Sequence, residues 1–236
     1  MTGQTKEYHG FLNGFALKCI AMVTMLIDHT GMVLFPRYMI FRMIGRLAFP
    51  IYCFLLVEGA VHTSNWKKYL GRLFLFALIS EIPFNLAVGG QLWYPKTQNV
   101  FFTLFLGLLA VLLLKAPNVG RNRWLITGIR VILVLVLVLA AGLARTDYGA
   151  GGVIFILVFY VFRSQLLLKS AAFAAATAFL YGGIENYAIL SLAPILCYNG
   201  KRGPGALKYV FYVFYPAHLL LLYLLATYVF HGAAVY

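Results

Sequence analysis

A small set of ionisable side chains lies inside apolar runs of this sequence, where such groups are rare. Residues 22–35 read MVTMLIDHTGMVLF and place Asp28 and His29 side by side. An ionisable group in the middle of a membrane costs at least about 3 kcal/mol, so it usually faces a cavity or a partner and marks a functional site. A neutral imidazole near carboxylates has the properties of a general base, which takes a proton from an attacking amine or hydroxyl.

Lys18 belongs to the same predicted helix as His29. Eleven residues at 100° each make about three turns, so the two side chains share one face, roughly 16 Å apart along the helix axis. Asp28 points about a quarter-turn away, and we expect it to pair with a cation from another helix, for which Arg46 is the candidate. A buried ion pair that only fixes helix packing is the alternative for both Asp28 and His29.

Two later apolar runs also carry polar side chains. Glu58 and His62 are spaced i,i+4, where a carboxylate can orient an imidazole, although capping of the helix end also explains His62. Glu81 and Asn85 share a face with Pro83 between them, which favours either a hydrated pocket or a plain kink. One His and one Glu without a third ligand are weak grounds for a metal, so no metal site is predicted.

The last apolar run contains VFYPAHLLLLY, where Pro216 is expected to break the helix just before His218. A histidine beside a kink is a candidate ligand or proton relay, because such a kink leaves backbone groups and space to be filled. A histidine that is simply satisfied in the core is the alternative.

Membrane helices are the elements that must position these residues. The 236 residues are 63% hydrophobic and 11% charged, far from the composition of soluble domains. A span needs about 20 mostly apolar residues. Nine segments qualify, at 15–35, 43–61, 68–88, 99–115, 124–144, 149–162, 166–181, 185–198 and 207–230. We therefore expect an all-α, polytopic transmembrane helix bundle, with residues 1–236 forming a single domain in the lipid bilayer.

The charge distribution predicts the orientation of this bundle. The formal charge is +13, from 19 Lys and Arg against 6 Asp and Glu. The basic residues fall mainly between the apolar runs, where positive-inside topology explains them, so nucleic acid is not a predicted partner. The N-terminal side holds Lys6, Lys67, Lys68, Arg72, Lys115, Arg121, Arg123, Arg163, Lys169, Lys201, Arg202 and Lys208, and the other side holds Arg37, Arg42, Lys96 and Arg145. The N-terminus is therefore predicted to be cytoplasmic.

Several enzyme classes are disfavoured because their motifs are absent. The sequence has no G-x-S-x-G elbow, C-x-x-C pair, phosphate-binding loop or H-E-x-x-H motif. Acyl transfer by acid–base chemistry and proton-coupled transport of a small solute remain, since buried charges can relay protons. The lack of inverted halves disfavours transport. A non-catalytic assembly or lipid-binding protein is a third possibility.

Three strings resemble the TraX family of bacterial inner-membrane proteins: LKCIAMVTMLIDHTGMVLF, RMIGRLAFPIYCFLLVEGAVHTSNWKKYLGRLFLFALISEIPFNL and FYPAHLLLL. The founding TraX protein acetylates the N-terminal amine of conjugative pilin, and the family resembles the acyltransferase-3 group. In that group an Arg or Lys is followed, after ten residues, by a His in the first span, and Lys18 and His29 fit this spacing. The resemblance implies a multi-pass acetyltransferase of the bacterial inner membrane, with His29 catalytic and cytoplasmic acetyl-coenzyme A as donor. Many acyltransferase-3 proteins have an SG pair where this chain has Glu58 and Gly59, so the acceptor geometry of that group is not transferred.

The resemblance also organises the remaining candidate residues. Asp28, Glu58, Glu81 and His218 are expected to line or shape the cavity around His29. Coenzyme A needs cations for its phosphates, and cations lie near the predicted cytoplasmic helix ends. The candidates for donor binding are Lys18, Arg46, Lys67, Lys68 and Arg72, with Arg121, Arg123, Lys201 and Arg202 as helpers. The sequence leaves the acceptor open among a protein N-terminus, a glycan and a small metabolite.

Overall fold

The computed structural model describes residues 10–117, 122–205 and 208–230. Its elements are α1 (Gly14–Val33), α2 (Met39–Gly45), α3 (Ala48–His62), α4 (Trp66–Gly89), α5 (Val100–Lys115), α6 (Arg123–Leu143), α7 (Gly149–Val161), α8 (Leu166–Leu180), the 3₁₀ helix η1 (Gly183–Ser191), α9 (Leu192–Leu196) and α10 (Lys208–Tyr228). Over these residues the chain forms helices and two isolated β-bridges, which confirms the all-α prediction.

Asparagine caps explain where four of the helices begin. Asn13, Asn65, Asn99 and Asn122 each precede a helix, and each side-chain oxygen accepts a hydrogen bond from a backbone N–H in the first turn. Such a cap satisfies an N–H that has no partner inside the helix. At the other end of α4, Gly90 adopts the left-handed conformation, with φ of 64°, which a glycine takes without strain.

The second predicted span differs from the observed helices. The sequence predicted one helix over 43–61, whereas the structure has α2 and α3, separated at Arg46 and Leu47. Pro50 gives the physical reason, because it lacks an N–H and cannot bond to the carbonyl of Arg46, four residues earlier. The break matters for the site, since it leaves Arg46 at the junction between two helices.

Two further predictions about helix breaks need correction. Pro216 was expected to break the last helix, yet α10 continues through it from Lys208 to Tyr228. The predicted span at 185–198 is instead the 3₁₀ helix η1 followed by the five-residue α9. Gly182 and Gly183, with φ of 66° and 53°, turn the chain sharply into η1.

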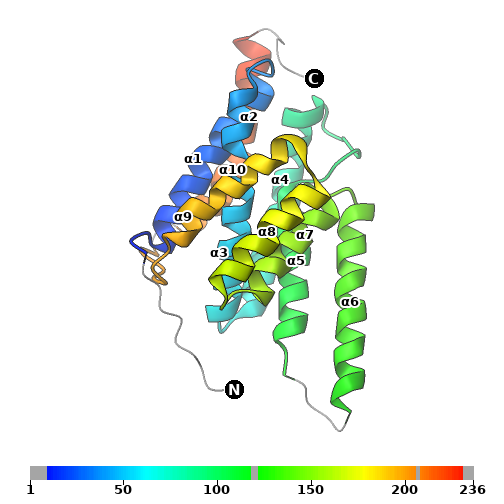
Figure 1. Ribbon diagram of the computed structural model, residues 1–236. Helices are drawn as coiled ribbons and strands as arrows, with labels where there is room; N and C mark the ends of the chain where they lie inside the picture. Colours follow the sequence, from blue (N-terminus) through cyan, green and yellow to red (C-terminus); the bar gives the residue numbers. More distant parts are fainter. Residues whose placement is uncertain (1–9, 118–121, 206–207, 231–236) are drawn as a thin grey trace.

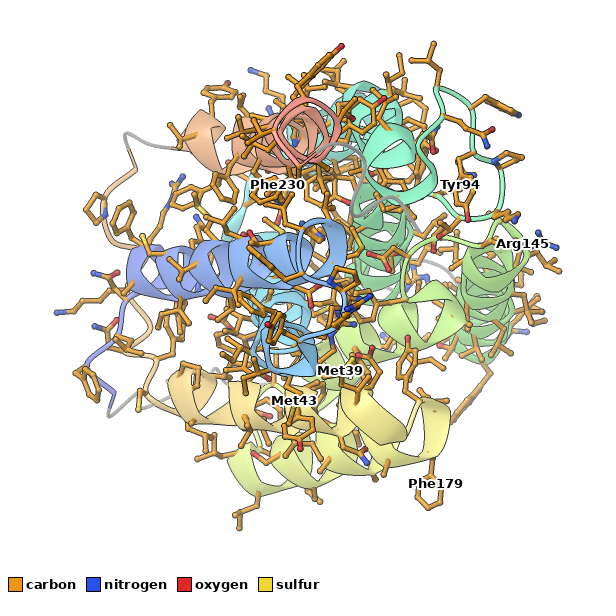
Figure 2. The ribbon with its side chains drawn as sticks, turned by 90° about the horizontal axis from the view of Figure 1, so that it is seen from above. Met39, Met43, Tyr94, Arg145, Phe179 and Phe230 are labelled. Carbon is orange, nitrogen blue, oxygen red and sulfur yellow. The ribbon has the colours of Figure 1, made fainter. Side chains whose placement is uncertain are left out.

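The helices pack as one bundle, and α1 lies toward one side of it in Figure 1. Helix α1 contacts α2, α3 and α10, while α4 packs against α10 and α5, and α7 packs against α3, α5 and α8. Viewed from above in Figure 2, α10 and α4 lie on one side of α1, and α8 with η1 lies on the opposite side. The interior is filled by buried apolar side chains, including Leu17, Ile51, Leu108, Ile156 and Leu219.

The outer surface of the bundle is apolar, as expected for a protein in lipid. α6 stands at one edge of the molecule in Figure 1, and its Ile132, Leu135 and Leu139 are 61%, 56% and 63% exposed. Phe179, at the end of α8, is 90% exposed and projects outward in Figure 2. Soluble proteins rarely leave such wide apolar surfaces uncovered.

Five helical segments of the described chain are long and apolar enough to cross a membrane. They are Gly14–Val33, Met39–His62, Trp66–Gly89, Arg123–Leu143 and Tyr209–Tyr228. The other apolar helices, Val100–Lys115, Gly149–Val161, Leu166–Leu180 and Gly183–Leu196, are shorter. The nine predicted apolar segments thus all fall on helical structure, whereas by length only five reach the span of a bilayer.

Candidate functional site

A large cavity lies between the helices of the described chain and joins most of the predicted site residues. Its volume is about 680 Å³, and residues of α1, α2, α3, α4, α5 and α10 line it together with the segments before α7 and after α9. We call one end the basic end, which is lined by Lys18, Arg72 and Arg202. We call the other the histidine end, where His29 lies with Asp28.

His29 is held by a second histidine that the sequence places 189 residues away. The Nδ1 atom of His29 lies 2.6 Å from Nε2 of His218, and the two rings are nearly parallel, at 14°. His218 is buried, and its Nδ1 lies 2.6 Å from the backbone carbonyl of Phe214. The structure therefore brings together two residues predicted for one site, α1 supplying the first and α10 the second.

These contacts dictate which nitrogen of His29 is free to act as a base. A carbonyl can only accept, so Nδ1 of His218 carries a proton and donates to Phe214. Neutral His218 then has a lone pair at Nε2, which accepts from the Nδ1–H of His29. In neutral His29 the remaining nitrogen, Nε2, is left with its lone pair. His218 thus orients His29, as a third group commonly orients the base in an active site.

Asp28 points away from its neighbour His29 and forms a buried ion-pair network, as predicted. Both carboxylate oxygens lie 2.7 Å from Nη2 of Arg46, and Oδ2 also lies 2.7 Å from Nη1 of Arg42. The Nη1 atom of Arg46 is in turn 2.6 Å from Oε1 of Glu185, in η1. Asp28 and Arg46 are 7% and 6% exposed, so this network ties α1, the α2–α3 junction and η1 together in the interior.

The network occupies Arg46, which the sequence also proposed for donor binding. Its guanidinium contacts two carboxylates and lies 5.9 Å from the ring centre of Tyr148. Although Arg46 lines the cavity, these contacts make it a structural support for the histidine end. In the described structure both Nη atoms of its guanidinium donate to carboxylates, which disfavours Arg46 as a phosphate-binding residue.

The segment before α7 completes the histidine end with Asp147 and Tyr148. The hydroxyl of Thr103 donates to the backbone carbonyl of Asp147. The ring of Tyr148 stacks on that of Phe49, with the ring centres 3.8 Å apart. Burial raises the pKa of the Asp147 carboxyl to about 6, and the charge of Arg46 offsets part of that rise.

At the basic end, cations from three separate segments face the cavity. Lys18 comes from α1, Arg72 from α4, and Arg202 from the segment after α9. The backbone holds that segment against the start of α1, where the N–H of Gly14 donates to the carbonyl of Lys201 at 2.8 Å. The Arg72 guanidinium lies 5.6 Å from the ring of Tyr69 and 6.0 Å from that of Tyr212. A convergent set of cations with donor groups of this kind suits phosphate groups.

The other predicted cations lie elsewhere. Lys67 and Lys68, at the exposed start of α4, do not belong to the cavity lining, and Lys67 lies over the ring of Trp66 at 5.6 Å. Arg123 and Lys201 are likewise outside the lining, and Arg121 falls outside the described residues. The predicted set of cations therefore contains the three that face the cavity at its basic end, together with several that do not.

Glu58 and His62 both line the cavity, but their contact differs from the predicted one. The sequence spacing favoured a carboxylate–imidazole pair, whereas Nδ1 of His62 lies 2.8 Å from the backbone carbonyl of Glu58. Since α3 ends at His62, this contact is a local one within the last turn and a half of the helix. The position of His62 at the helix end agrees with the capping alternative.

Glu81 does not line the cavity. Its Oε2 accepts from Nδ2 of Asn99 at 2.5 Å, which fixes the start of α5 against α4. Asn85 donates to the backbone carbonyl of Leu92 at 3.2 Å and is also outside the lining. The structure therefore does not place these two residues in the cavity lining. Their face of α4 meets a neighbouring loop and α5, and their side chains hold the ends of helices there.

Sequence reasoning missed two members of the ion-pair network. Arg42 was counted only as a loop charge, although it lies four residues before Arg46 and hence near the same face. Glu185 is one of only 6 Asp and Glu in the chain. The scarcity of acidic residues was a signal that each one has a partner, whereas its pairing with Arg46, 139 residues away, required the fold.

Together the fold and the cavity define a class: a helical membrane protein with an internal cavity lined by His29, behind which His218 lies outside the lining. The chain belongs to the TraX family, whose model, described as TraX protein, matches residues 13–226. This confirms the resemblance seen in the three sequence strings.

Two known proteins are similar in sequence to this chain. The probable fimbrial assembly protein FimC, serogroup H1, of Dichelobacter nodosus is 33% identical over 239 residues, which cover 89% of this chain and 94% of that protein. An uncharacterized protein of Rickettsia prowazekii (strain Madrid E) is 31% identical over 91 residues, which cover 39% of this chain and 33% of that protein. No solved structure matches the chain.

Proposed function

We propose that this protein is a membrane-embedded acetyltransferase that moves an acetyl group from acetyl-coenzyme A to an amine or hydroxyl acceptor. One observation carries the proposal: a single cavity joins three cations at the basic end to His29 at the histidine end. Lys18 and His29 are eleven residues apart in α1, roughly 16 Å along the helix axis. This separation suits a donor whose charged phosphates and reactive thioester lie at opposite ends of a long flexible arm.

The residues divide into donor binding and chemistry. Lys18, Arg72 and Arg202 would hold the phosphates of coenzyme A, since ammonium and guanidinium groups form charge-assisted hydrogen bonds with phosphate. The apolar walls between the two ends, including Met25 and Leu56, would enclose the pantetheine arm. Exclusion of water along this path protects the thioester from hydrolysis.

In the proposed reaction, Nε2 of His29 removes the proton of the acceptor amine or hydroxyl as the acceptor attacks the acetyl carbonyl carbon. A bond forms between the acceptor atom and this carbon, and the carbonyl oxygen gains the negative charge. When the carbonyl re-forms, the carbon–sulfur bond breaks and the thiolate of coenzyme A leaves. The imidazolium of His29 then returns the proton to the thiolate, so protons and electrons balance.

His218 acts in this scheme as a positioning residue. By accepting a hydrogen bond from the Nδ1–H of His29, His218 keeps the lone pair of His29 on Nε2 and stabilises the positive charge that develops on the imidazole. The Phe214 carbonyl fixes His218 in turn. Asp28 holds the neighbouring helices through Arg46 and Arg42, and so supports the histidine end without touching the reacting atoms.

We place the protein in the bacterial cytoplasmic membrane as a multi-pass protein, with its N-terminus in the cytoplasm. This orientation puts the basic end of the cavity on the side where acetyl-coenzyme A is made. The acceptor would then reach His29 from the outer side or from within the bilayer. The name of the Dichelobacter relative, a probable fimbrial assembly protein, favours an acceptor in a fimbria or pilus among the candidates.

Binding of acetyl-coenzyme A to the purified protein tests the proposal. We expect saturable binding that weakens by about 10-fold in each of Lys18→Gln, Arg72→Gln and Arg202→Gln, because each change removes a charged donor. The matched control is Lys67→Gln with Lys68→Gln, which removes two cations outside the cavity and should leave the affinity unchanged.

Absence of acetyl-coenzyme A binding would contradict the proposal. In that case proton uptake into liposomes, driven by a solute and without any acyl donor, would favour the proton-coupled transporter. Binding that depends equally on all cations would instead indicate non-specific attraction to a basic protein.

A further inference from the structure

Two tyrosine hydroxyls in the cavity wall have no hydrogen-bond acceptor for their proton among the described residues. Tyr52 of α3 and Tyr215 of α10 both line the cavity, and the hydroxyl oxygen of each is buried. Burial of a hydroxyl without a partner is costly, and a phenylalanine of the same shape would fill the space without that cost. A buried hydroxyl without an acceptor, on a side chain that lines a cavity, is therefore a candidate for a hydrogen bond to a ligand.

Tyr215 is the one that lies beside the histidines. Its ring meets the rings of His29 and His218 edge-on, with centres 5.9 Å and 5.8 Å apart. It precedes His218 by three residues on the same helix, so the turn of α10 that positions the histidine also positions this tyrosine. No ring contact links Tyr52 to either histidine in the described structure.

The hydroxyl of Tyr215 is available as a donor. The start of α5 borders it, where Val100 lines the cavity and its backbone N–H faces this hydroxyl. An N–H can only donate, so the phenol's own proton still lacks an acceptor. The nearby guanidinium groups of Arg42 and Arg46 are already bound to carboxylates. The Tyr215 ring thus lies beside His29, and its hydroxyl has no acceptor in the described structure.

We propose that the Tyr215 hydroxyl donates a hydrogen bond to the acetyl carbonyl oxygen of the donor and stabilises the oxyanion formed during transfer. The inference rests on the acetyltransferase proposed above and adds the group that stabilises the negative charge. While His29 takes the acceptor's proton, the carbonyl oxygen becomes negative and its bond to the Tyr215 proton strengthens. Tyr215 keeps its proton throughout, and the charge disappears when the carbon–sulfur bond breaks. A fixed donor of this kind acts where charge develops in the transition state.

Tyr215→Phe tests the inference because it keeps the ring and removes only the hydroxyl. We expect kcat for acetyl transfer to fall on the order of 10²- to 10³-fold, with the affinity for acetyl-coenzyme A unchanged. Tyr52→Phe removes a comparable buried hydroxyl away from the histidines, and its kcat should exceed that of Tyr215→Phe by at least about 10-fold. A Tyr215→Phe protein with kcat within about threefold of the wild type would overturn the inference.

A second measurement tests the contact without turnover. A ketone analogue of acetyl-coenzyme A keeps the carbonyl but has no thiol to release, and its ¹³C-labelled carbonyl stretch can be recorded when bound. The stretch should lie at a lower frequency in the wild type than in Tyr215→Phe, because a hydrogen bond weakens the carbonyl bond. Equal frequencies would overturn the inference.

The two proposals fail in different ways. If the wild type neither binds nor consumes acetyl-coenzyme A, or if His29→Ala keeps full activity, the proposed function fails and Tyr215 loses its role with it. If the wild type is active and depends on His29 while Tyr215→Phe matches it in both kcat and carbonyl frequency, only the assignment of Tyr215 fails.

Discussion

His29 and His218 act as a unit in the proposed chemistry, and this makes a specific prediction for His218. A glutamine can offer an oxygen to the Nδ1–H of His29, whereas a phenylalanine cannot. We expect His218→Phe to lower kcat on the order of 10²-fold and His218→Gln to lower it clearly less, since orientation of the base is partly kept. The measurement is the rate of coenzyme A release, and equal rates in both variants would show that His218 does not orient His29.

Asp28 supports the site by compensating two buried or partly buried arginines. In Asp28→Asn the guanidinium of Arg46, 6% exposed, keeps only Glu185 as a charged partner. Removing one member of a buried ion pair typically costs about 3–5 kcal/mol, and we expect a loss of this size in the free energy of unfolding, measured in mixed micelles.

Glu185→Gln is the matched control for Asp28→Asn. The Glu185 side chain is 21% exposed, and Arg46 retains both oxygens of Asp28 when it is changed. The destabilisation should therefore be clearly smaller. A larger loss in Glu185→Gln than in Asp28→Asn would contradict the view that Asp28 anchors the network.

Individual residues of the site were predictable where helix geometry alone decides their position. The spacing of Lys18 and His29 placed both on one face of α1, and the quarter-turn offset directed Asp28 toward a cation from another helix. The contact between His29 and His218 was beyond such reasoning, because their separation of 189 residues is bridged only by packing of α10 on α1. Glu81 was misplaced because its spacing from Asn85 could not show which neighbour that face of α4 meets.

At the scale of elements, the contact between α1 and α2 depends on a glycine. A Cβ built on Gly45 would lie 2.1 Å from Cβ of Asp28, so a larger residue must push the two helices apart. We expect Gly45→Ala to lower the free energy of unfolding by about 1–3 kcal/mol and to disturb the ion-pair network.

Gly128→Ala, in α6, is the matched control for the same change. A Cβ there has no atom within 4 Å, and alanine favours the helix by up to about 1 kcal/mol. Gly128→Ala should thus be neutral or stabilising in the same unfolding assay. Equal losses at both glycines would show that the close approach of α1 and α2 has no special role.

The helices themselves were largely predictable, because long apolar runs and asparagine caps are local signals. Predicted and observed ends differ by a few residues in α1, α4 and α5. The division of α2 from α3 depends on Pro50 and was readable in principle, since a proline removes one backbone bond. The continuity of α10 through Pro216 could not be predicted from the sequence, because packing against neighbouring helices decides whether a proline ends a membrane helix.

At the scale of the whole molecule, the proposed orientation predicts which positions are accessible from each side. In a protein whose three cysteines are replaced, Lys67→Cys lies near the basic end and Lys96→Cys near the histidine end. We expect a membrane-impermeant maleimide added outside to label Lys96→Cys in cells with a permeabilised outer envelope. Lys67→Cys should react only after the cytoplasmic membrane is disrupted, and the reverse pattern would contradict the orientation derived from loop charge.

The central claim is that His29 transfers an acetyl group from a donor held at the other end of the cavity. Coenzyme A release by the purified protein in lipid nanodiscs, with acetyl-coenzyme A and an amine acceptor, measures this directly. We predict that the wild type releases coenzyme A and that His29→Ala, folded and still able to bind the donor, loses on the order of 10²- to 10⁴-fold in rate. A folded His29→Ala protein that releases coenzyme A at the wild-type rate would contradict the claim.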